Sequence, residues 1–368
     1  MTTSADRRWM RAALTLAQRH RGLTGPNPSV GCVLVAEGRV VARAVTAPGG
    51  RPHAEAQALS TAGARAKGAT AYVTLEPCAH HGQTPPCATA LIEAGIARVV
   101  IGAFDPDPRV AGRGVTILRA AGVSVDRACK AQAEEVHRGF LHRQRLGRPF
   151  LTLKLATSLD GKIATATGES RWITGVQARR AVHLMRARSD AVLIGRGTAQ
   201  ADAPRLDVRD LGLAPRTPIA VVASSSGQLP PGPLRDAAAS RPVWLAHGPD
   251  ANVDPMAHTG VRGLPVQLTP QGQLDTSALL ARLGQEGVNE VLCEGGATLA
   301  ASLVQAGLVD ALVWINAGLS LGAHGLSALG PFGSAVLADA PRFVLQNHRN
   351  LGGDVISVWR PATGASSA

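Results

Sequence analysis

The 368-residue sequence predicts the α/β fold class, arranged as two successive domains. The chain is longer than one usual domain, so two domains are the default expectation. In each half, short apolar runs typical of buried strands alternate with helical patterns, which predicts helices packed on sheets. The polar segment before Gly147 and the following Arg148-Pro149 pair separate the two series. We therefore expect one domain over residues 1–146 and a second over residues 150–360.

The first half begins with an amphipathic pattern over residues 1–20, which predicts a helix. Residues 29–45 alternate around Glu37-Gly38 and predict a β-hairpin. Pro52 suits the first position of a helix, which predicts a helix over 52–66 with Pro52 at that position. The remaining predicted elements are a strand over 70–76, a helix over 85–95 closed by Gly95, strands over 97–104 and 123–129, and one polar helix over 130–147.

The second half contains a new series of predicted elements. Candidate buried strands cover 149–156, 190–195, 218–224, 242–247, 289–294 and 310–316. Candidate helices cover 175–187, 275–287 and 297–307, between those strands. Residues 342–360 predict a closing hairpin turned at Gly352-Gly353.

Composition narrows the functional classes. No apolar run approaches the roughly 18 residues of a membrane span, and the N-terminus lacks the apolar region of a signal peptide. Five cysteines, an odd number scattered along the chain, argue against a disulfide framework and for a reducing cytoplasm, where close cysteine pairs more often bind metal. The net charge of +12 is concentrated in residues 1–150, where 20 basic and 10 acidic side chains give +10. An anionic partner would explain this charge, either a phosphorylated small molecule or a nucleic acid; a compositional bias towards arginine and alanine is an equally simple explanation.

A metal site is predicted around the segment EPCAHHGQTPPC at residues 76–87. Together with His53, the thiols of Cys78 and Cys87 form a ligand set that suits zinc and leaves one tetrahedral position for water. Pro52 and Pro86 place His53 and Cys87 at helix starts, where the positive helix end stabilises a thiolate. Glu55, two residues after His53, can then reach a water on the metal without ligating it.

A closed structural zinc site is the alternative, and His80 or His81 could supply its fourth ligand. The H-x-E pattern at a helix start favours the open, catalytic site. The other cysteines, Cys32, Cys129 and Cys293, have no partner at ligand spacing and are expected to be small packed residues.

Eight motifs in one order then carry a resemblance that covers nearly the whole chain. PNPSVGC (26–32), PHAE (52–55), TLEPCAHHGQTPPC (74–87) and DPDPRVAGRG (105–114) resemble the pyrimidine deaminases of riboflavin biosynthesis. SLDGKIA (158–164), GESRWIT (168–174), GTAQADAPRLDVR (197–209) and EGGATLA (294–300) resemble the reductase to which that deaminase is usually fused. The resemblance implies a cytidine-deaminase-like α/β/α sandwich followed by a dihydrofolate-reductase-like α/β domain.

The resemblance also implies an activity for each half. The first domain would hydrolyse the exocyclic amine of 2,5-diamino-6-(5-phosphoribosylamino)pyrimidin-4-one, and the second would reduce the ribosyl group to ribityl with NADPH. In the deaminase half, the implied residues are His53, Cys78 and Cys87 for Zn²⁺, Glu55 for proton transfer and Asn27 for substrate.

In the reductase half, the implied residues fall into two sets. The NADPH set is Ala156, Trp172, Thr198, Asp202, Ser224 and the turn of Gly296, Ala297, Thr298, Leu299, Ala300, Ala301 and Ser302. The substrate set is Lys154, Ser170, Arg186, Leu206, Arg209 and Glu294. The planar forks of Arg186 and Arg209 suit phosphate recognition, and the strand–glycine–helix pattern at 289–303 could hold a phosphate at the helix N-terminus.

Three positions depart from the family pattern. Thr46 stands where the family usually has a histidine, Gln83 where it has Lys or Arg, and Ala203 where it has a second aspartate. Positions 46 and 83 are expected to touch the substrate, so a reductase with an inactive or redirected deaminase domain remains the alternative. A basic RNA-binding or RNA-editing protein is a third hypothesis, disfavoured by the 3% content of aromatic residues. We expect a phosphorylated ribotide substrate, no nucleic-acid or membrane partner, and a homo-oligomer.

Overall fold

The structure, a computed structural model, describes residues 2–80, 85–213, 216–251 and 260–362. The chain divides into two compact units, residues 1–148 and 149–368. In the described ranges, no helix is long and apolar enough to cross a membrane.

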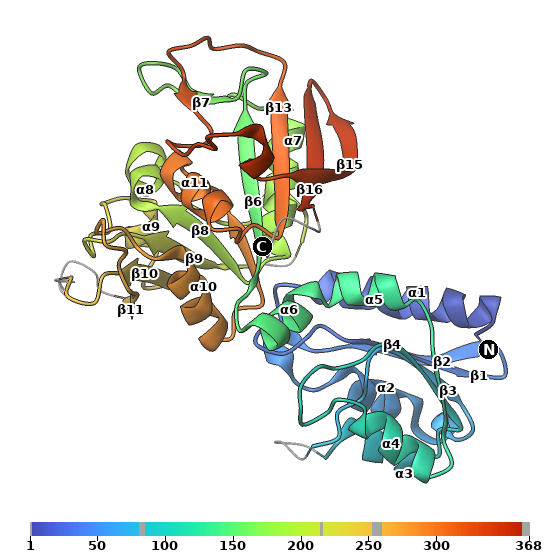
Figure 1. Cartoon of the computed structure of the whole chain (residues 1–368). Helices are drawn as coiled ribbons and strands as arrows, with labels where there is room; N and C mark the ends of the chain where they lie inside the picture. The colour runs from blue at the N-terminus through green and yellow to red at the C-terminus, as the bar shows by residue number, and fades with distance from the viewer. Residues whose placement is uncertain (1, 81–84, 214–215, 252–259, 363–368) are drawn as a thin grey trace. The chain divides into compact units, whose positions relative to one another are not determined.

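The first unit is built on a five-stranded sheet in the order β2-β1-β3-β4-β5. β1 is antiparallel to β2 and β3, whereas β3, β4 and β5 run parallel. Figure 1 shows α1 and α5 on one face of this sheet and α2, α3 and α4 on the other, which confirms the α/β/α sandwich. The elements are α1 Ser4–His20, β1 Gly31–Ala36, β2 Arg39–Val45, η1 Pro48–Gly50, α2 Ala54–Ala62, η2 Gly63–Ala66, β3 Thr70–Leu75, α3 Cys87–Glu93, β4 Arg98–Ala103, α4 Arg113–Ala120, β5 Ser124–Arg127, α5 Lys130–Val136 and α6 Arg138–Leu146.

A buried carboxylate anchors the first helix to this sheet. Asp6 forms a capping box with Thr3 and is 1% exposed. Its carboxylate also accepts hydrogen bonds from Tyr72 Oη on β3 at 2.9 Å and from Arg98 Nη1 on β4 at 2.8 Å. The ion pair with Arg98 holds the pKa of Asp6 well below its usual range. One side chain therefore caps α1 and fixes it to two strands.

Two predictions about helices in this unit are wrong. Pro52 does not occupy the first helical position: His53 is the N-cap and α2 begins at Ala54. The carbonyl of Pro52 accepts hydrogen bonds from Ala47 N and Gln57 Nε2, so it is held by the preceding segment instead of starting the helix. The polar helix predicted over 130–147 is two helices, α5 and α6, because the side chain of His137 turns into the core, where its Nε2 lies 2.9 Å from Thr74 Oγ1.

The second unit is built on a nine-stranded sheet in the order β11-β10-β9-β8-β12-β6-β13-β16-β15. The seven strands from β11 to β13 are parallel, and β16 and β15 form an antiparallel edge. The elements are β6 Phe150–Thr157, β7 Lys162–Ala164, α7 Val176–Ala187, β8 Ala191–Gly195, α8 Arg196–Asp202, β9 Ile219–Ala223, α9 Pro233–Asp236, β10 Val243–His247, β11 Val261–Pro265, α10 Thr276–Gln285, β12 Glu290–Cys293, α11 Ala297–Gln305, β13 Ala311–Ala317, β14 Leu326–Ser327, η3 Leu337–Asp339, β15 Phe343–Leu351 and β16 Asp354–Pro361.

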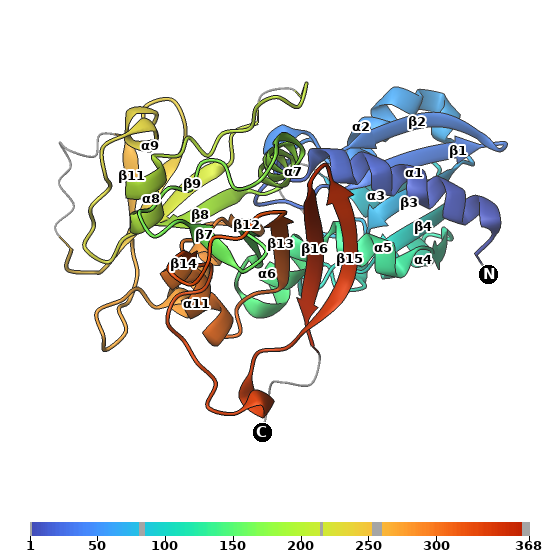
Figure 2. The ribbon, with the colours of Figure 1, turned by 90° about the horizontal axis from the view of Figure 1, so that it is seen from above.

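Alternating strand residues divide the core of this unit between the two faces of the sheet. Leu193 and Val221 join the cluster under α10 and α11, whereas Ile194 and Val222 join the cluster that includes Ala199 of α8. Ala178 of α7 packs on β13 and β16. Figure 2 shows α7 and α11 on opposite sides of the sheet. Helices on both faces explain why the central strands read as continuous apolar runs.

Candidate functional site

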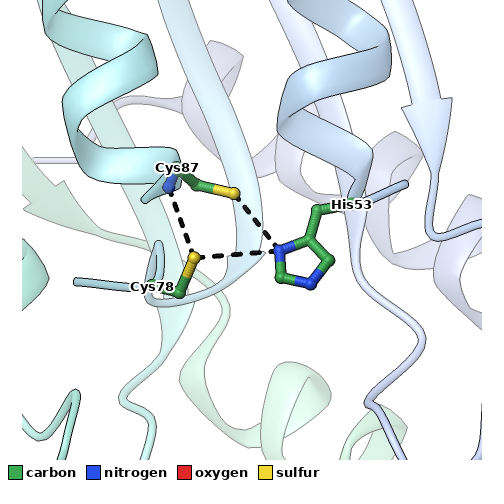
Figure 3. A group of neighbouring side chains, drawn as sticks. All are labelled: His53, Cys78 and Cys87. Atoms are coloured by element: carbon green, nitrogen blue, oxygen red, sulfur yellow. Dashed lines mark hydrogen bonds between the residues drawn. The ribbon is translucent and has the colours of Figure 1, made fainter. Parts of the chain in front are cut away.

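The predicted metal ligands converge in the first unit. His53 is the N-cap of α2, Cys87 is the first residue of α3, and Cys78 follows β3. His53 Nδ1 lies 3.3 Å from Cys87 Sγ and 3.7 Å from Cys78 Sγ, and Cys87 N donates to Cys78 Sγ at 3.3 Å (Figure 3). All three ligand atoms lie within 4.8 Å of one another.

This geometry fits zinc. Tetrahedral coordination with the usual Zn–N and Zn–S lengths separates ligand atoms by roughly 3.5–3.8 Å, close to the observed separations. The backbone N–H of Cys87 stabilises the thiolate of Cys78, and the pKa of Cys78 is lowered to about 4, with the hydrogen bond from the Cys87 thiol as its largest cause. Two thiols and an imidazole are the soft and borderline donors that zinc prefers.

The metal group has three members, and among the described residues His80 is not one of them. His80 is therefore not placed as the fourth ligand that a closed site would need. His81 and Gln83, which the sequence analysis also considered, lie outside the described residues.

Glu55 lies in the first turn of α2 and is 4% exposed. The pKa of Glu55 is raised to about 7, mainly because the carboxyl is buried and secondly because of the negative charge of Cys78. A carboxyl group with a pKa near neutral pH can both take up and release a proton under physiological conditions.

A second acidic residue, which the sequence analysis did not single out, positions the Cys78 loop. The carboxylate of Glu76 is buried and accepts hydrogen bonds from Gly112 N at 3.1 Å and Val115 N at 3.2 Å, at the start of α4. A Cβ on Gly114 would lie 2.1 Å from the carbonyl oxygen of Pro77, so only glycine allows this approach. These contacts explain the GRG end of the 105–114 motif.

Asn27 and Thr46, the two described positions of the deaminase half that are expected to touch the substrate, make different backbone contacts. Asn27 Nδ2 donates to the carbonyl of Gly50, three residues before His53. Thr46 is 2% exposed, and its hydroxyl accepts from Val30 N at 2.9 Å. The side chain of Thr46 is therefore engaged in joining two backbone segments.

In the second unit, Lys154, Arg186 and Glu294 form a buried ionic cluster. The guanidinium of Arg186 forms a bidentate ion pair with Glu294: Nε donates to Oε1 at 2.5 Å and Nη2 donates to Oε2 at 2.9 Å. Lys154 Nζ lies 3.5 Å from Glu294 Oε2. Burial raises the pKa of Glu294, but the two cations outweigh it and lower the pKa to about 2. The fork of Arg186 that was predicted to bind phosphate is therefore filled by Glu294.

The loop after α8 carries Leu206 and Arg209. Leu206 is 2% exposed with a left-handed backbone (φ 50°), and Arg209 forms an ion pair with Asp207. Arg241, which the sequence analysis did not select, donates to the carbonyls of Arg205 at 2.6 Å and Pro218 at 2.7 Å. Arg241 therefore links this loop to the residue that precedes β9.

The predicted cofactor residues lie mostly at the carboxyl ends of β8, β9 and β12. Gly296 N donates to Thr198 Oγ1 at 2.8 Å, and α11 starts directly after this turn. Asp202 lies 3.4 Å from Ser170 Oγ, another predicted site residue, and Ser224 is buried at the end of β9. Trp172 is 66% exposed beneath the guanidinium of Arg179. Ala156 lies on β6, and Ala300–Ser302 lie within α11.

Comparisons with known proteins agree with this architecture. The RibD C-terminal domain family matches residues 149–357, and the cytidine and deoxycytidylate deaminase zinc-binding region matches residues 3–103. The Riboflavin biosynthesis protein RibD of Escherichia coli (strain K12) is 45% identical over 366 residues, covering 95% of this chain and 98% of the relative. The chain belongs to the RibD family.

Solved RibD structures support the same assignment. Acinetobacter baumannii RibD, form 1, is 38% identical, has a TM-score of 0.86, and the match covers 98% of this chain and 99% of that chain. A deaminase/reductase from Thermotoga maritima is 31% identical with a TM-score of 0.86, covering 97% and 99%. The two-domain RibD architecture therefore extends over nearly the whole chain.

Proposed function

We propose that residues 1–146 deaminate 2,5-diamino-6-(5-phosphoribosylamino)pyrimidin-4(3H)-one and that residues 150–360 then reduce its ribosyl group to ribityl with NADPH. The protein is a bifunctional enzyme of riboflavin biosynthesis, as its RibD membership and its two domain families indicate. The observation that carries the first activity is the convergence of His53, Cys78 and Cys87 next to the buried carboxyl of Glu55.

Glu55 is proposed to move the proton in the deaminase half. Zinc held by His53, Cys78 and Cys87 would supply an activated water at neutral pH. With its pKa raised to about 7, Glu55 would accept a proton from that water and deliver it to the leaving amine. Asn27 is proposed to bind the substrate, a role supported by its amide contact near the start of α2.

The ionic cluster is proposed to orient the substrate in the reductase half. NADPH would supply the hydride. Lys154 and the pair of Arg186 and Glu294 would hold the ribose end, with Ser170, Leu206 and Arg209 around it. The turn at Gly296 suits a cofactor phosphate because a Cβ there would lie 2.8 Å from Thr198 Oγ1 and the N–H groups of the first turn of α11 have no helical acceptors. The remaining NADPH contacts are proposed for Ala156, Trp172, Asp202, Ser224 and residues 297–302.

The test is ammonia release from the diaminopyrimidine ribotide by zinc-loaded protein without NADPH, followed by addition of NADPH. Glu55→Gln is the matched control, because it keeps the size of the side chain and lies outside the ligand group. We expect ammonia release in the wild type, a loss of at least about 100-fold in the variant, and NADPH oxidation only after deamination.

The outcomes separate the alternatives. If zinc-loaded wild type released no ammonia but reduced the deaminated ribotide, the protein would be a reductase with an inactive or redirected deaminase domain. Failure of both steps would overturn the proposed function.

The partner is proposed to be the phosphorylated ribotide, with no nucleic acid or membrane involved, and the protein is proposed to act in the cytoplasm as a homo-oligomer. All five cysteines are free, which supports a reducing compartment. Steep salt-dependent binding to tRNA would contradict the absence of a nucleic-acid partner.

A further inference from the structure

A cluster of hydroxyl groups and one arginine lies at the carboxyl ends of two neighbouring strands. Arg196 is the first residue after β8, and Ser224 and Ser226 follow β9. Arg196 Nη1 lies 3.3 Å from Ser226 Oγ and 3.5 Å from Gln228 Oε1. Ser226 Oγ lies 3.4 Å from Ser224 Oγ, whose own hydroxyl accepts from Gln228 N at 3.2 Å.

Among the residues that the structure describes, no carboxylate pairs with the charge of Arg196. Within the described ranges, its side-chain hydrogen-bond partners are both uncharged oxygens, and it forms no salt bridge. Arg196 and Ser226 are both exposed, whereas Ser224 is buried beneath them. The guanidinium of Arg196 and the hydroxyl of Ser226 therefore face solvent, and the buried hydroxyl of Ser224 lies next to that of Ser226.

The order of the strands in the sheet sets the distance between this cluster and the turn at Gly296, which is proposed to bind a cofactor phosphate. β12, β8 and β9 are consecutive neighbours, and Gly296, Thr198 and Ser224 follow them in that order. Strands lie about 4.8 Å apart, so the loops after β12 and β9 are roughly 10 Å apart. This is the scale of one nucleoside, and ligands of open α/β sheets bind outside the carboxyl ends of the strands.

We propose that Arg196 and Ser226 bind the 2′-phosphate on the adenosine ribose of the cofactor and thereby determine the preference for NADPH over NADH. This inference rests on the proposed reductase function and deepens it. A dianionic phosphate would replace the weak amide contact of Arg196 with charge-assisted hydrogen bonds to the planar fork. Ser226 would donate its hydroxyl proton to a second phosphate oxygen. NADH carries a hydroxyl at this position, which offers the guanidinium no charge.

Equilibrium binding of two cofactor fragments tests the proposal without turnover. Adenosine 2′,5′-bisphosphate carries the 2′-phosphate and AMP lacks it, so titration calorimetry on the full-length protein isolates that one group. We expect the wild type to prefer the bisphosphate, and Arg196→Gln to weaken bisphosphate binding by about 10- to 100-fold while AMP binding stays within twofold. Ser226→Ala should cause a smaller loss of the same kind.

Arg349→Gln is the control for overall charge, because Arg349 is an exposed arginine on β15, the edge strand at the other end of the sheet. It should leave both affinities unchanged. All substituted side chains are exposed, so the variants are expected to fold.

The outcomes distinguish this inference from the proposed function. If the wild type binds NADPH but Arg196→Gln keeps its preference for the bisphosphate within twofold, the assignment of Arg196 is wrong while the reductase function stands. Equal binding of both fragments by the wild type would also overturn it. A wild type that neither binds nor oxidises NADPH would remove the proposed reductase function itself.

Discussion

Removing the charge of Glu294 should destabilise the reductase unit by about 3 kcal/mol. The carboxylate is 8% exposed and is held by Arg186 and Lys154, which are themselves 12% and 13% exposed. Its pKa is about 2 in the folded protein against the usual 4.5, and at about 1.4 kcal/mol for each pH unit the difference amounts to about 3 kcal/mol. Breaking a buried ion pair by removing one partner costs about 3–5 kcal/mol, which agrees.

Glu294→Gln is the variant that measures this contribution, because it keeps the shape and one acceptor. A suitable assay is denaturant unfolding at pH 7 monitored by tryptophan fluorescence. Four of the five tryptophans lie in the second unit: Trp172, Trp244, Trp314 and Trp359. The lowered pKa of Glu294 also determines how its contribution to stability changes with pH. A lowered folded pKa stabilises above pH 4.5, and the advantage of the wild type should shrink as the pH falls from 4.5 towards 2.

A double-mutant cycle with Arg186→Met provides the control. Each single variant leaves a buried charge with a weaker partner, whereas the double variant removes both members of the pair, so the two losses should not add. A loss below about 1 kcal/mol in Glu294→Gln, or strictly additive losses in the cycle, would refute the idea that the pair is a desolvated unit.

Three further predictions concern the deaminase unit. Cys87→Ser should lose zinc, measured by metal analysis, and with it ammonia release, while reduction of the deaminated ribotide continues; loss of both activities would contradict independent sites. Gly114→Ala should lower zinc affinity about 10- to 100-fold, because its Cβ would lie 2.1 Å from the oxygen of Pro77, next to Cys78; unchanged affinity in a chelator competition would show that the loop tolerates the shift. Burial lowers the pKa of His137 to about 4, so the unfolded state takes up a proton first as the pH falls below about 6.5, and stability should decline by up to about 3 kcal/mol between pH 6.5 and 4. His137→Gln should flatten that slope in urea unfolding, and an unchanged slope would be evidence against this assignment.

The zinc ligands could be predicted from the sequence because their information is local. His53 and Cys87 each stand beside a proline at a helix start, and Cys78 follows an apolar strand directly. The same local reasoning failed for α4. Its N-cap is Gly112, and the carboxylate that caps it comes from Glu76, 36 residues earlier, so no side chain in the segment itself marks the helix start.

The reductase cluster shows the opposite case. Lys154, Arg186 and Glu294 are spread over 140 residues, on β6, on α7 and after β12, and only the pairing of β6 with β12 brings the first and last together. The residues were selected by resemblance, and periodicity alone would have left them as solvated charges. The fork of Arg186 illustrates the limit, because the sequence gives no sign that a carboxylate already occupies it.

Thr46 shows how a departure from a family pattern changes meaning once its surroundings are known. The hydroxyl accepts from Val30 N, the backbone N–H of Thr46 donates to Val30 O at 2.9 Å, and its carbonyl oxygen lies 2.9 Å from His20 Nδ1. A histidine at this 2% exposed position would have to displace the hydroxyl and leave Val30 N without its acceptor, at a cost of about 1–3 kcal/mol. Failure of Thr46→His to raise deaminase activity would therefore report on this buried junction as much as on substrate affinity. Stability must be measured beside activity before the substitution says anything about the substrate.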